Sequence, residues 1–270
     1  MKGFTRVTGS PSDDWPWPVF TRGAGPPVVI LQELAGVTPE LLYFATRLSD
    51  EGFTVWLPVL AGPAPATTAL DRTRAMVATC LSHEIHLFAT RRTSPMANSL
   101  RALTRHAAQH CGTAGAGVIG MCWTGGFALA LAADKSVLGA VAAQPSLPLG
   151  TPLTPRCRRS LGMDESDIRT VQDRLATGEV EIYLTRFTDD WISPRERIAA
   201  LEKAWGSTGI TIDQLSSAPD NPFGFGKKDH SVLSIAPVRH PDGPGRDRLD
   251  RTYQEVVSFL RRRIIPAALP

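Results

Sequence analysis

Three segments of the sequence carry residue types and spacings that suit nucleophilic catalysis. The first is Gly120-Met-Cys122-Trp-Thr-Gly125-Gly126, in which a cysteine stands among small residues at the end of an apolar run. A strand that turns sharply into a helix at such a position holds the side chain up on a strained turn, as in a nucleophile elbow. The start of the helix favours a thiolate there. Cys122 is therefore the candidate nucleophile, and the backbone N–H of Trp123 is a candidate oxyanion donor.

The other two segments supply an acid and a base further along the chain. Asp189 and Asp190 follow a predicted strand that ends near Phe187, and His230 follows a loop rich in Gly, Pro and Asn. A carboxylate can orient and polarise a histidine, which in turn relays the protons of a nucleophilic reaction. The chain order nucleophile, acid, histidine is that of α/β-hydrolases. The position after a strand leaves Asp189 and Asp190 as alternatives for the acid.

The elements that must position these residues alternate between strands and helices. Apolar runs and helical spacing of apolar side chains predict strands over 28–31, 53–57, 117–121, 137–142, 180–187 and 210–215, and helices over 39–51, 69–90, 96–110, 127–133, 165–176, 194–205 and 247–263. Thr38 is predicted to cap the first helix, with Pro39 in its first turn. The alternation predicts an α/β fold with a mostly parallel, doubly wound sheet and helices on both faces. Ligands of such sheets bind beyond the carboxyl ends of the strands.

Composition and charge are those of an ordinary globular protein. The chain has 270 residues, of which 43% are hydrophobic and 20% are charged, and no repeat or linker divides it. We therefore expect one domain over residues 1–270. The net charge of +3 is too small to indicate a nucleic-acid partner.

The cysteines and the apolar segments bear on the cellular compartment. The four cysteines, Cys80, Cys111, Cys122 and Cys157, include no CxxC pair, which favours a reducing compartment over a disulfide scaffold. The first thirty residues lack the apolar core of a signal peptide. Residues 111–133 carry no charge, but their glycines fit a buried strand, turn and helix better than a membrane span. These features predict a soluble, cytoplasmic protein without a membrane partner.

Several motifs together resemble the dienelactone hydrolase family, over roughly residues 25–262. The matching segments are Gln32-Glu33, Gly36-Val37, GMCWTGG at 120–126, the D-W-I-S-P run from Asp190, and His230-Ser231. The resemblance implies an α/β-hydrolase fold with Cys122 as nucleophile, Asp190 as acid and His230 as base. Pro194 fits the family pattern when the acid is Asp190. The resemblance also implies that Glu33 lies beside the thiol and helps to control its ionisation, and that the N–H of Leu34 is the second oxyanion donor.

The activity that the resemblance implies is cysteine-dependent hydrolysis of a small ester or lactone, through an acyl-enzyme and without a metal or organic cofactor. Two positions depart from the family pattern. Thr124 stands where the elbow usually has glycine, and Ser234 stands where the namesake lactonase has an arginine that binds the substrate carboxylate. The chloroaromatic-degradation substrate is therefore not expected.

Other functions stay open at the level of the sequence. The same triad can perform acyl transfer, lactonisation or cyclisation in secondary metabolism. A catalytically silent protein that binds an acyl ligand or a protein partner is an alternative from another class, against which the intact Cys122, Asp190 and His230 argue. The oligomeric state is not predicted.

Two further patterns are interpreted as structural. The GxGxxG at 115–120 enters a predicted strand instead of following one, so it does not indicate a dinucleotide site. The pairs His83/His86 and His106/His110 lack a third metal ligand, and both are interpreted as solvated helix faces.

Overall fold

The computed structural model describes residues 1–8, 15–80, 95–146, 154 and 158–265. The strands are β1 Thr5–Arg6, β2 Val19–Arg22, β3 Pro27–Leu31, β4 Thr54–Pro58, β5 Ala116–Met121, β6 Val137–Ala143, β7 Glu181–Phe187 and β8 Ile210–Leu215. The helices are α1 Pro39–Asp50, α2 Ala69–Cys80, α4 Pro95–His110, the short 3-10 turn η1 Cys122–Thr124, α5 Gly125–Leu131, α7 Glu165–Ala176, α8 Arg195–Trp205, α9 Ala236–Arg239 and α10 Gly243–Ile264.

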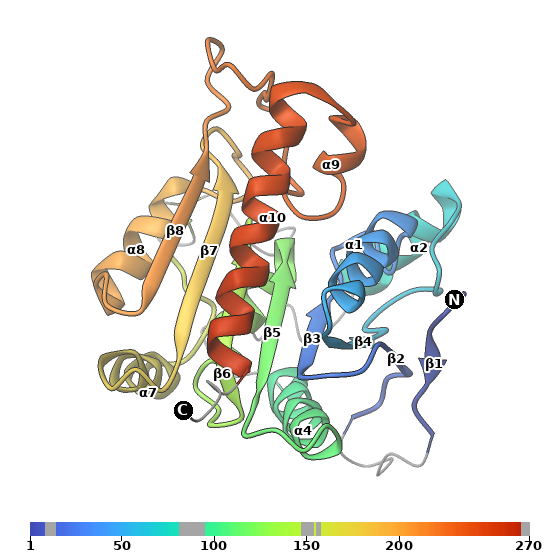
Figure 1. Ribbon diagram of the computed structural model, residues 1–270. Helices are drawn as coiled ribbons and strands as arrows, with labels where there is room; N and C mark the ends of the chain where they lie inside the picture. Colours follow the sequence, from blue (N-terminus) through green and yellow to red (C-terminus); the bar gives the residue numbers. More distant parts are fainter. Residues whose placement is uncertain (9–14, 81–94, 147–153, 155–157, 266–270) are drawn as a thin grey trace.

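One eight-stranded sheet organises these elements. The strand order is β1-β2-β4-β3-β5-β6-β7-β8. The strands from β4 to β8 pair in parallel, whereas β1 and β2 add an antiparallel edge. The carboxyl ends of the parallel strands lie at the top of Figure 1, toward the side where α9 lies. The predicted α/β fold with a mostly parallel sheet is confirmed.

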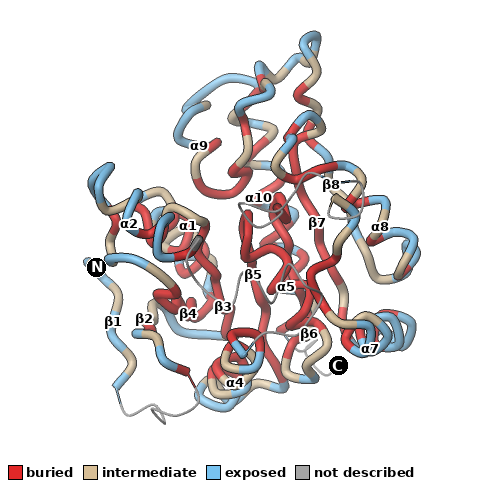
Figure 2. Tube along the Cα trace, turned by 180° about the vertical axis from the view of Figure 1, so that it is seen from behind, coloured by how far each residue is buried: buried red, intermediate tan, exposed pale blue. Residues whose placement is uncertain are grey.

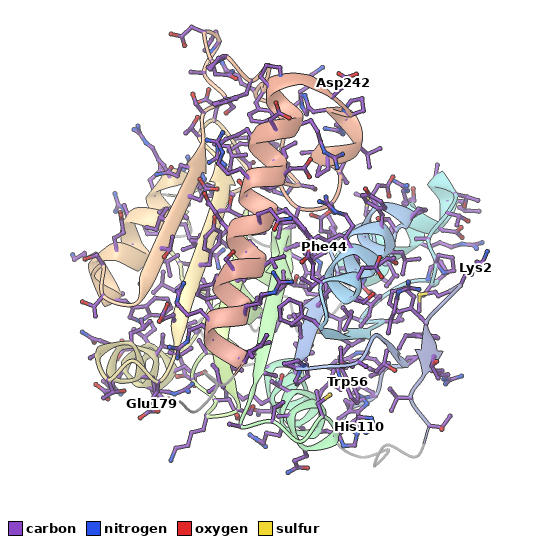
Figure 3. The ribbon with its side chains drawn as sticks, viewed as in Figure 1. Lys2, Phe44, Trp56, His110, Glu179 and Asp242 are labelled. Atoms are coloured by element: carbon purple, nitrogen blue, oxygen red, sulfur yellow. The ribbon has the colours of Figure 1, made fainter. Side chains whose placement is uncertain are left out.

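Helices cover both faces of the sheet because consecutive side chains of each buried strand point to opposite faces. In β3, Val28 and Ile30 belong to the core under α1 and α10, while Val29 and Leu31 belong to the core under α4, α5, α7 and α8. In Figure 1, α10 and α1 lie in front of the sheet. Figure 2 shows the molecule from the opposite side, where α5 covers the other face. Phe44 of α1, which is labelled in Figure 3, packs edge-on against Tyr253 of α10, with ring centroids 6.2 Å apart.

The central strands are buried along their whole length, as their apolar sequences predict. Every residue of β3, β4 and β5 is buried, and in Figure 2 these strands run through the interior as continuous buried tube. The uncharged stretch 111–133 contains β5, η1 and α5, which are the strand, turn and helix predicted for it. Among the described residues, no helix combines the length and apolarity needed to cross a membrane.

The predicted elements match the observed ones with small shifts at their ends, and the exceptions are local. Thr38 caps α1 as predicted, since its Oγ1 accepts a hydrogen bond from the Leu41 N–H at 3.3 Å. The helix predicted over 69–90 is described only to Cys80, because residues 81–94 lie outside the described residues, as does Cys157. The sequence did not predict β1, β2 and α9, which are too short for a clear periodic pattern.

The interpretation of His106 and His110 as a solvated face needs correction. The ring of His106 packs edge-on against Trp15 and Trp56, with centroids 5.2 and 5.6 Å apart. His110 is exposed, yet its ring centroid lies 5.3 Å from that of Trp56, and both residues are labelled in Figure 3. This part of α4 therefore packs on the tryptophans, whose long-range contacts the helical spacing alone does not reveal. His83 and His86 lie outside the described residues.

Candidate active site

Cys122 occupies a strained turn between β5 and α5. Its φ of 59° lies in the left-handed region, which non-glycine residues rarely adopt and which costs of the order of 1–3 kcal/mol. The turn is tight enough to require glycine on both sides. A Cβ at Gly120 would lie 2.2 Å from the Thr124 carbonyl oxygen, and one at Gly125 would lie 2.8 Å from Cα of Pro145. The backbone thus makes the strained strand-to-helix turn that the sequence predicts at this position.

Thr124, which replaces the glycine of the family pattern, is fully buried and bonded within this turn. Its Oγ1 accepts a hydrogen bond from the Met121 N–H at 2.9 Å. The same hydroxyl lies 2.9 Å from the Met121 carbonyl oxygen, and 3.2 and 3.1 Å from the carbonyl oxygens of Leu31 and Gln32 at the end of β3. The threonine therefore links the elbow to the segment that carries Glu33.

His230 and Asp190 form a close pair next to the elbow. The Nδ1 of His230 lies 2.6 Å from Oδ2 of Asp190. The other carboxylate oxygen, Oδ1, accepts hydrogen bonds from the backbone N–H groups of Ile192 and Ser193, at 3.0 and 3.3 Å. Asp189 is exposed. Of the two candidate acids, the structure places Asp190 beside the histidine.

A buried arginine fixes the loop that carries Asp190. The guanidinium of Arg186, on β7, donates hydrogen bonds to the carbonyl oxygens of Thr188, Asp190 and Ser193 at 2.9 to 3.1 Å. Burial lowers the pKa of Arg186, against the opposing effect of the Asp190 charge. Because its donors bond these backbone carbonyls and the side-chain oxygen of Gln214, Arg186 leaves the Asp190 carboxylate free for His230.

Glu33 is buried at the same end of the sheet, and both of its carboxylate oxygens are engaged. Oε1 accepts a hydrogen bond from Gln144 Nε2 at 2.8 Å, and Oε2 accepts one from the Ser231 hydroxyl at 3.0 Å. Burial raises the pKa of Glu33 above its usual range, although the charge of His230 and the Ser231 hydrogen bond oppose this rise.

The hydrogen-bond partner of the Cys122 thiol is Ser146, and not the predicted neighbour Glu33. Its Sγ lies 3.3 Å from Oγ of Ser146, and both residues are buried. Ser146 also donates its backbone N–H to the Cys122 carbonyl oxygen at 3.0 Å. Sequence reasoning identified neither Ser146 nor Gln144. The signal that could have found them is their place directly after the buried strand β6, at the edge of the sheet where ligands bind.

One pocket of about 210 Å³ brings the predicted site residues together. The lining residues that the structure describes are Glu33, Leu34, Ala35, Met76, Cys122, Trp123, Ser146, Ile192, His230, Ser231 and Ile235. Trp123 lies in the first turn after the elbow, where backbone N–H groups lack intrahelical acceptors. Among the described residues, Nε2 of His230 is buried without a hydrogen-bond partner.

The protonation of His230 depends on its two neighbours. Burial alone would lower the pKa of His230, but the negative charge of the Cys122 thiolate and the hydrogen bond with Asp190 raise it well above its usual 6.5. The protonated form of His230 is therefore favoured here more than in a free histidine. In the part of the chain that the structure describes, no group of three His, Cys, Asp or Glu side chains is arranged to hold a metal ion.

Comparison with known proteins gives one family and one fold. The model of the dienelactone hydrolase family matches residues 18–231. A search of curated proteins found no significant match to the sequence. A dienelactone hydrolase-like promiscuous phosphotriesterase from metagenomic libraries is similar in structure, with a TM-score of 0.60 and 17% identity, covering 95% of this chain and 97% of that chain.

Two further solved structures share the fold. The dienelactone hydrolase of Anabaena variabilis has a TM-score of 0.57 and 15% identity, covering 97% of this chain and 99% of that chain. The monoacylglycerol lipase of Paleococcus ferrophilus has a TM-score of 0.51 and 15% identity, covering 94% of this chain and 98% of that chain. At these identities the structural likeness supports the α/β-hydrolase fold and leaves the substrate open.

Proposed function

The chain belongs to the dienelactone hydrolase family, and from this premise we propose that it hydrolyses an uncharged ester or lactone with Cys122 as nucleophile, His230 as base and Asp190 as the orienting acid. The observation that carries the proposal is the strained elbow at Cys122, which shares one pocket with a histidine held at 2.6 Å by a buried carboxylate. A thiolate, a base and an orienting acid are the three groups that covalent acyl transfer requires.

In the first half of the reaction, the Cys122 thiolate attacks the carbonyl carbon and forms a C–S bond. The carbonyl oxygen becomes an oxyanion, which the backbone N–H groups of Leu34 and Trp123 stabilise, each contributing roughly 3–4 kcal/mol. The C–O bond to the leaving group then breaks, and the imidazolium of His230 gives its proton to the departing alkoxide. The product of this half is a thioester on Cys122 together with a free alcohol.

In the second half, His230 takes a proton from a water molecule as its oxygen attacks the thioester carbonyl. The C–S bond breaks, the carboxylic acid leaves, and the thiolate–imidazolium pair is restored. Asp190 keeps the Nδ1 side of the ring occupied, so that Nε2 faces the reacting atoms in both halves.

We assign Glu33 a positioning role in this reaction. It bonds Ser231, the neighbour of His230 in the chain, and its charge interacts with that of His230. Glu33 thereby influences the ionisation of the thiol through the histidine, since its own two oxygens are bonded to Gln144 and Ser231.

The pocket supports an uncharged, apolar acyl group. Six of its described lining residues carry apolar side chains: Leu34, Ala35, Met76, Trp123, Ile192 and Ile235. None of the described lining residues is a lysine or an arginine. Apart from His230 at the reacting atoms, a carboxylate on the substrate would therefore find no cationic partner among the described lining residues, and its desolvation would oppose binding.

The experiment that tests the proposal compares the wild type with Cys122→Ala on aryl esters and lactones, with intact-mass detection of an acyl adduct. The matched control is Cys111→Ala, because Cys111 is a half-buried free cysteine that does not line the pocket. We expect Cys122→Ala to lose turnover and the adduct, whereas Cys111→Ala keeps both. A phosphotriester is included because one fold relative is described as a phosphotriesterase.

The alternatives predict different results. Acyl transfer, lactonisation or cyclisation would give an adduct on the wild type that an added alcohol or amine resolves faster than water does. A catalytically silent binding protein would give neither turnover nor adduct. Turnover that persists in Cys122→Ala would contradict the proposal directly.

A further inference from the structure

Hydrogen bonds connect the segment 144–146 to Glu33, Ser193 and Cys122. Gln144 follows β6 with a φ of 36°, and its side chain donates to Glu33. The carbonyl oxygen of Pro145 accepts a hydrogen bond from the Ser193 hydroxyl at 3.1 Å. Ser146 contacts Cys122 through both its backbone N–H and its hydroxyl. A strained, fully bonded segment of this kind holds its side chains in fixed places.

The backbone of Ser146 is fixed by a buried arginine, Arg197. Nη1 of Arg197 donates to the Ser146 carbonyl oxygen at 2.7 Å, and Nη2 donates to the Leu161 carbonyl oxygen at 3.1 Å. Arg197 is 1% exposed, and burial lowers its pKa to about 10. The cost of burying this charge is offset by hydrogen bonds to the backbone, one of which fixes the residue that touches the sulfur.

The Ser146 hydroxyl is free to act on the sulfur. Among the described residues, Sγ of Cys122 is the only hydrogen-bond partner of this hydroxyl. The titratable groups that line the same pocket are Glu33 and His230. Glu33 directs its oxygens to Gln144 and Ser231, and His230 directs Nδ1 to Asp190. His230 lies close enough to Cys122 for the thiolate to raise its pKa, while Ser146 contacts the sulfur with its hydroxyl at 3.3 Å.

We propose that Ser146 is a positioning residue of the proposed hydrolase, whose hydroxyl donates a hydrogen bond to the Cys122 thiolate, stabilises its charge and fixes its direction of attack. The proposal rests on the proposed function for its catalytic consequence, but the contact itself is independent of the substrate. A hydrogen bond to a charged group contributes more than one between neutral groups. Loss of the hydroxyl therefore disfavours the thiolate relative to the thiol.

The test measures the rate of iodoacetamide alkylation of Cys122 against pH, by mass spectrometry, in the wild type, Ser146→Ala and Ser146→Thr. We expect the midpoint of the profile to rise by about 1–2 pH units in Ser146→Ala. Ser146→Thr keeps the hydroxyl and should stay near the wild type. Aryl-ester kcat/KM at pH 7 should fall about 10-fold or more in Ser146→Ala, with the loss in kcat.

A buried hydroxyl elsewhere supplies the control. Thr104 of α4 is fully buried and its hydroxyl donates to the Leu100 carbonyl oxygen at 2.8 Å, far in the chain from the site. Thr104→Val should keep the wild-type alkylation profile. An unshifted profile in Ser146→Ala overturns the inference, and so does an equal shift in Ser146→Ala and Ser146→Thr.

The two proposals fail in different ways. If Cys122→Ala retains turnover, the proposed function is wrong, while the alkylation profiles still decide whether Ser146 stabilises the thiolate. If Cys122→Ala is inactive but Ser146→Ala alkylates as the wild type does, only the role of Ser146 is wrong.

Discussion

Gln144 connects Glu33 to the loop that carries the histidine. Its Nε2 donates to Oε1 of Glu33 at 2.8 Å, and its own Oε1 accepts a hydrogen bond from the Val232 N–H at 3.2 Å. The amide thus joins the segment after β3 to the residue two positions beyond His230. Glu33 is held in a buried place by this contact and by Ser231.

Ionisation of the buried Glu33 carboxyl should lower the free energy of unfolding at neutral pH. Burial raises the pKa of Glu33 in the folded protein above the value of 4.5 that it has when unfolded. The unfolded chain therefore releases its proton first, and the free energy of unfolding falls as the pH rises above 4.5 through the folded pKa. In Glu33→Gln this fall is absent, because the amide can accept from Gln144 and donate to the Ser231 hydroxyl without a charge. We expect the free energy of unfolding of Glu33→Gln, compared with that of the wild type, to be of the order of 1 kcal/mol more favourable at pH 7 than at pH 4. Urea unfolding of both proteins at the two pH values measures this difference.

The control for this prediction is Glu40, a glutamate whose pKa is lowered instead of raised. Glu40 is half-buried and bonded to Arg72 at 3.0 Å, and its pKa is lowered, by its hydrogen bonds and by the charge of Arg72, although burial opposes this. Glu40→Gln should lose stability at pH 7 relative to pH 4. A Glu33→Gln variant that behaves in the same direction as Glu40→Gln would show that Glu33 is stabilised, and not penalised, as an anion.

Much of the site could be predicted because its residues lie at the ends of strongly patterned strands. Cys122 follows a run of buried residues in β5, and Asp190 follows β7, so periodicity alone placed both at the carboxyl edge of the sheet. The choice between Asp189 and Asp190 needed the family pattern. In the structure Asp190 is buried beside His230, whereas Asp189 is exposed.

The contacts that could not be predicted are those between residues far apart in the chain. Glu33 was expected beside the thiol, but its oxygens bond Gln144 and Ser231, while Ser146 contacts the sulfur. These partners depend on the backbone conformation after β6, where Gln144 has a positive φ. No local sequence pattern specifies which polar side chain of such a segment turns inward.

The Thr124 hydroxyl should stabilise the turn at Cys122, so its removal should lower the free energy of unfolding. Thr124→Val keeps the shape of the side chain but removes the acceptor of the Met121 N–H. It also removes the one hydroxyl proton, which lies within reach of the carbonyl oxygens of Met121, Leu31 and Gln32. A buried group left without its partner costs about 1–3 kcal/mol. We expect Thr124→Val to lose about that much stability in urea unfolding, with a lower aryl-ester kcat because the elbow loosens.

Thr104→Val is again the matched control, since Thr104 is equally buried and its hydroxyl bonds only the carbonyl oxygen four residues earlier in its own helix. That carbonyl keeps its helical N–H, so the loss should be smaller. Equal losses for the two variants would mean that the Thr124 hydroxyl does not hold the elbow.

The apolar wall of the pocket should set the preference among substrates. The wild type is expected to hydrolyse a neutral hexanoyl aryl ester more efficiently than an ester whose acyl chain ends in a carboxylate, because the described wall offers no cation except His230, which faces the reacting atoms, to pair with that charge. Ile235 lines the pocket, and Ile235→Arg places a guanidinium there. We expect the ratio of kcat/KM for the charged to the neutral ester to rise by about 10-fold or more, which corresponds to ~1.4 kcal/mol.

The matched control is Val238→Arg. Val238 is also on the segment at α9, but it is 54% exposed and does not line the pocket. A guanidinium at position 238 changes the net charge by the same amount but does not line the pocket. It should therefore leave the ratio of kcat/KM for the charged to the neutral ester near that of the wild type. If both variants raise the ratio alike, the effect comes from long-range attraction of the anion, and the apolar wall does not determine the preference. If the wild type already prefers the charged ester, the proposal of an uncharged acyl group is wrong.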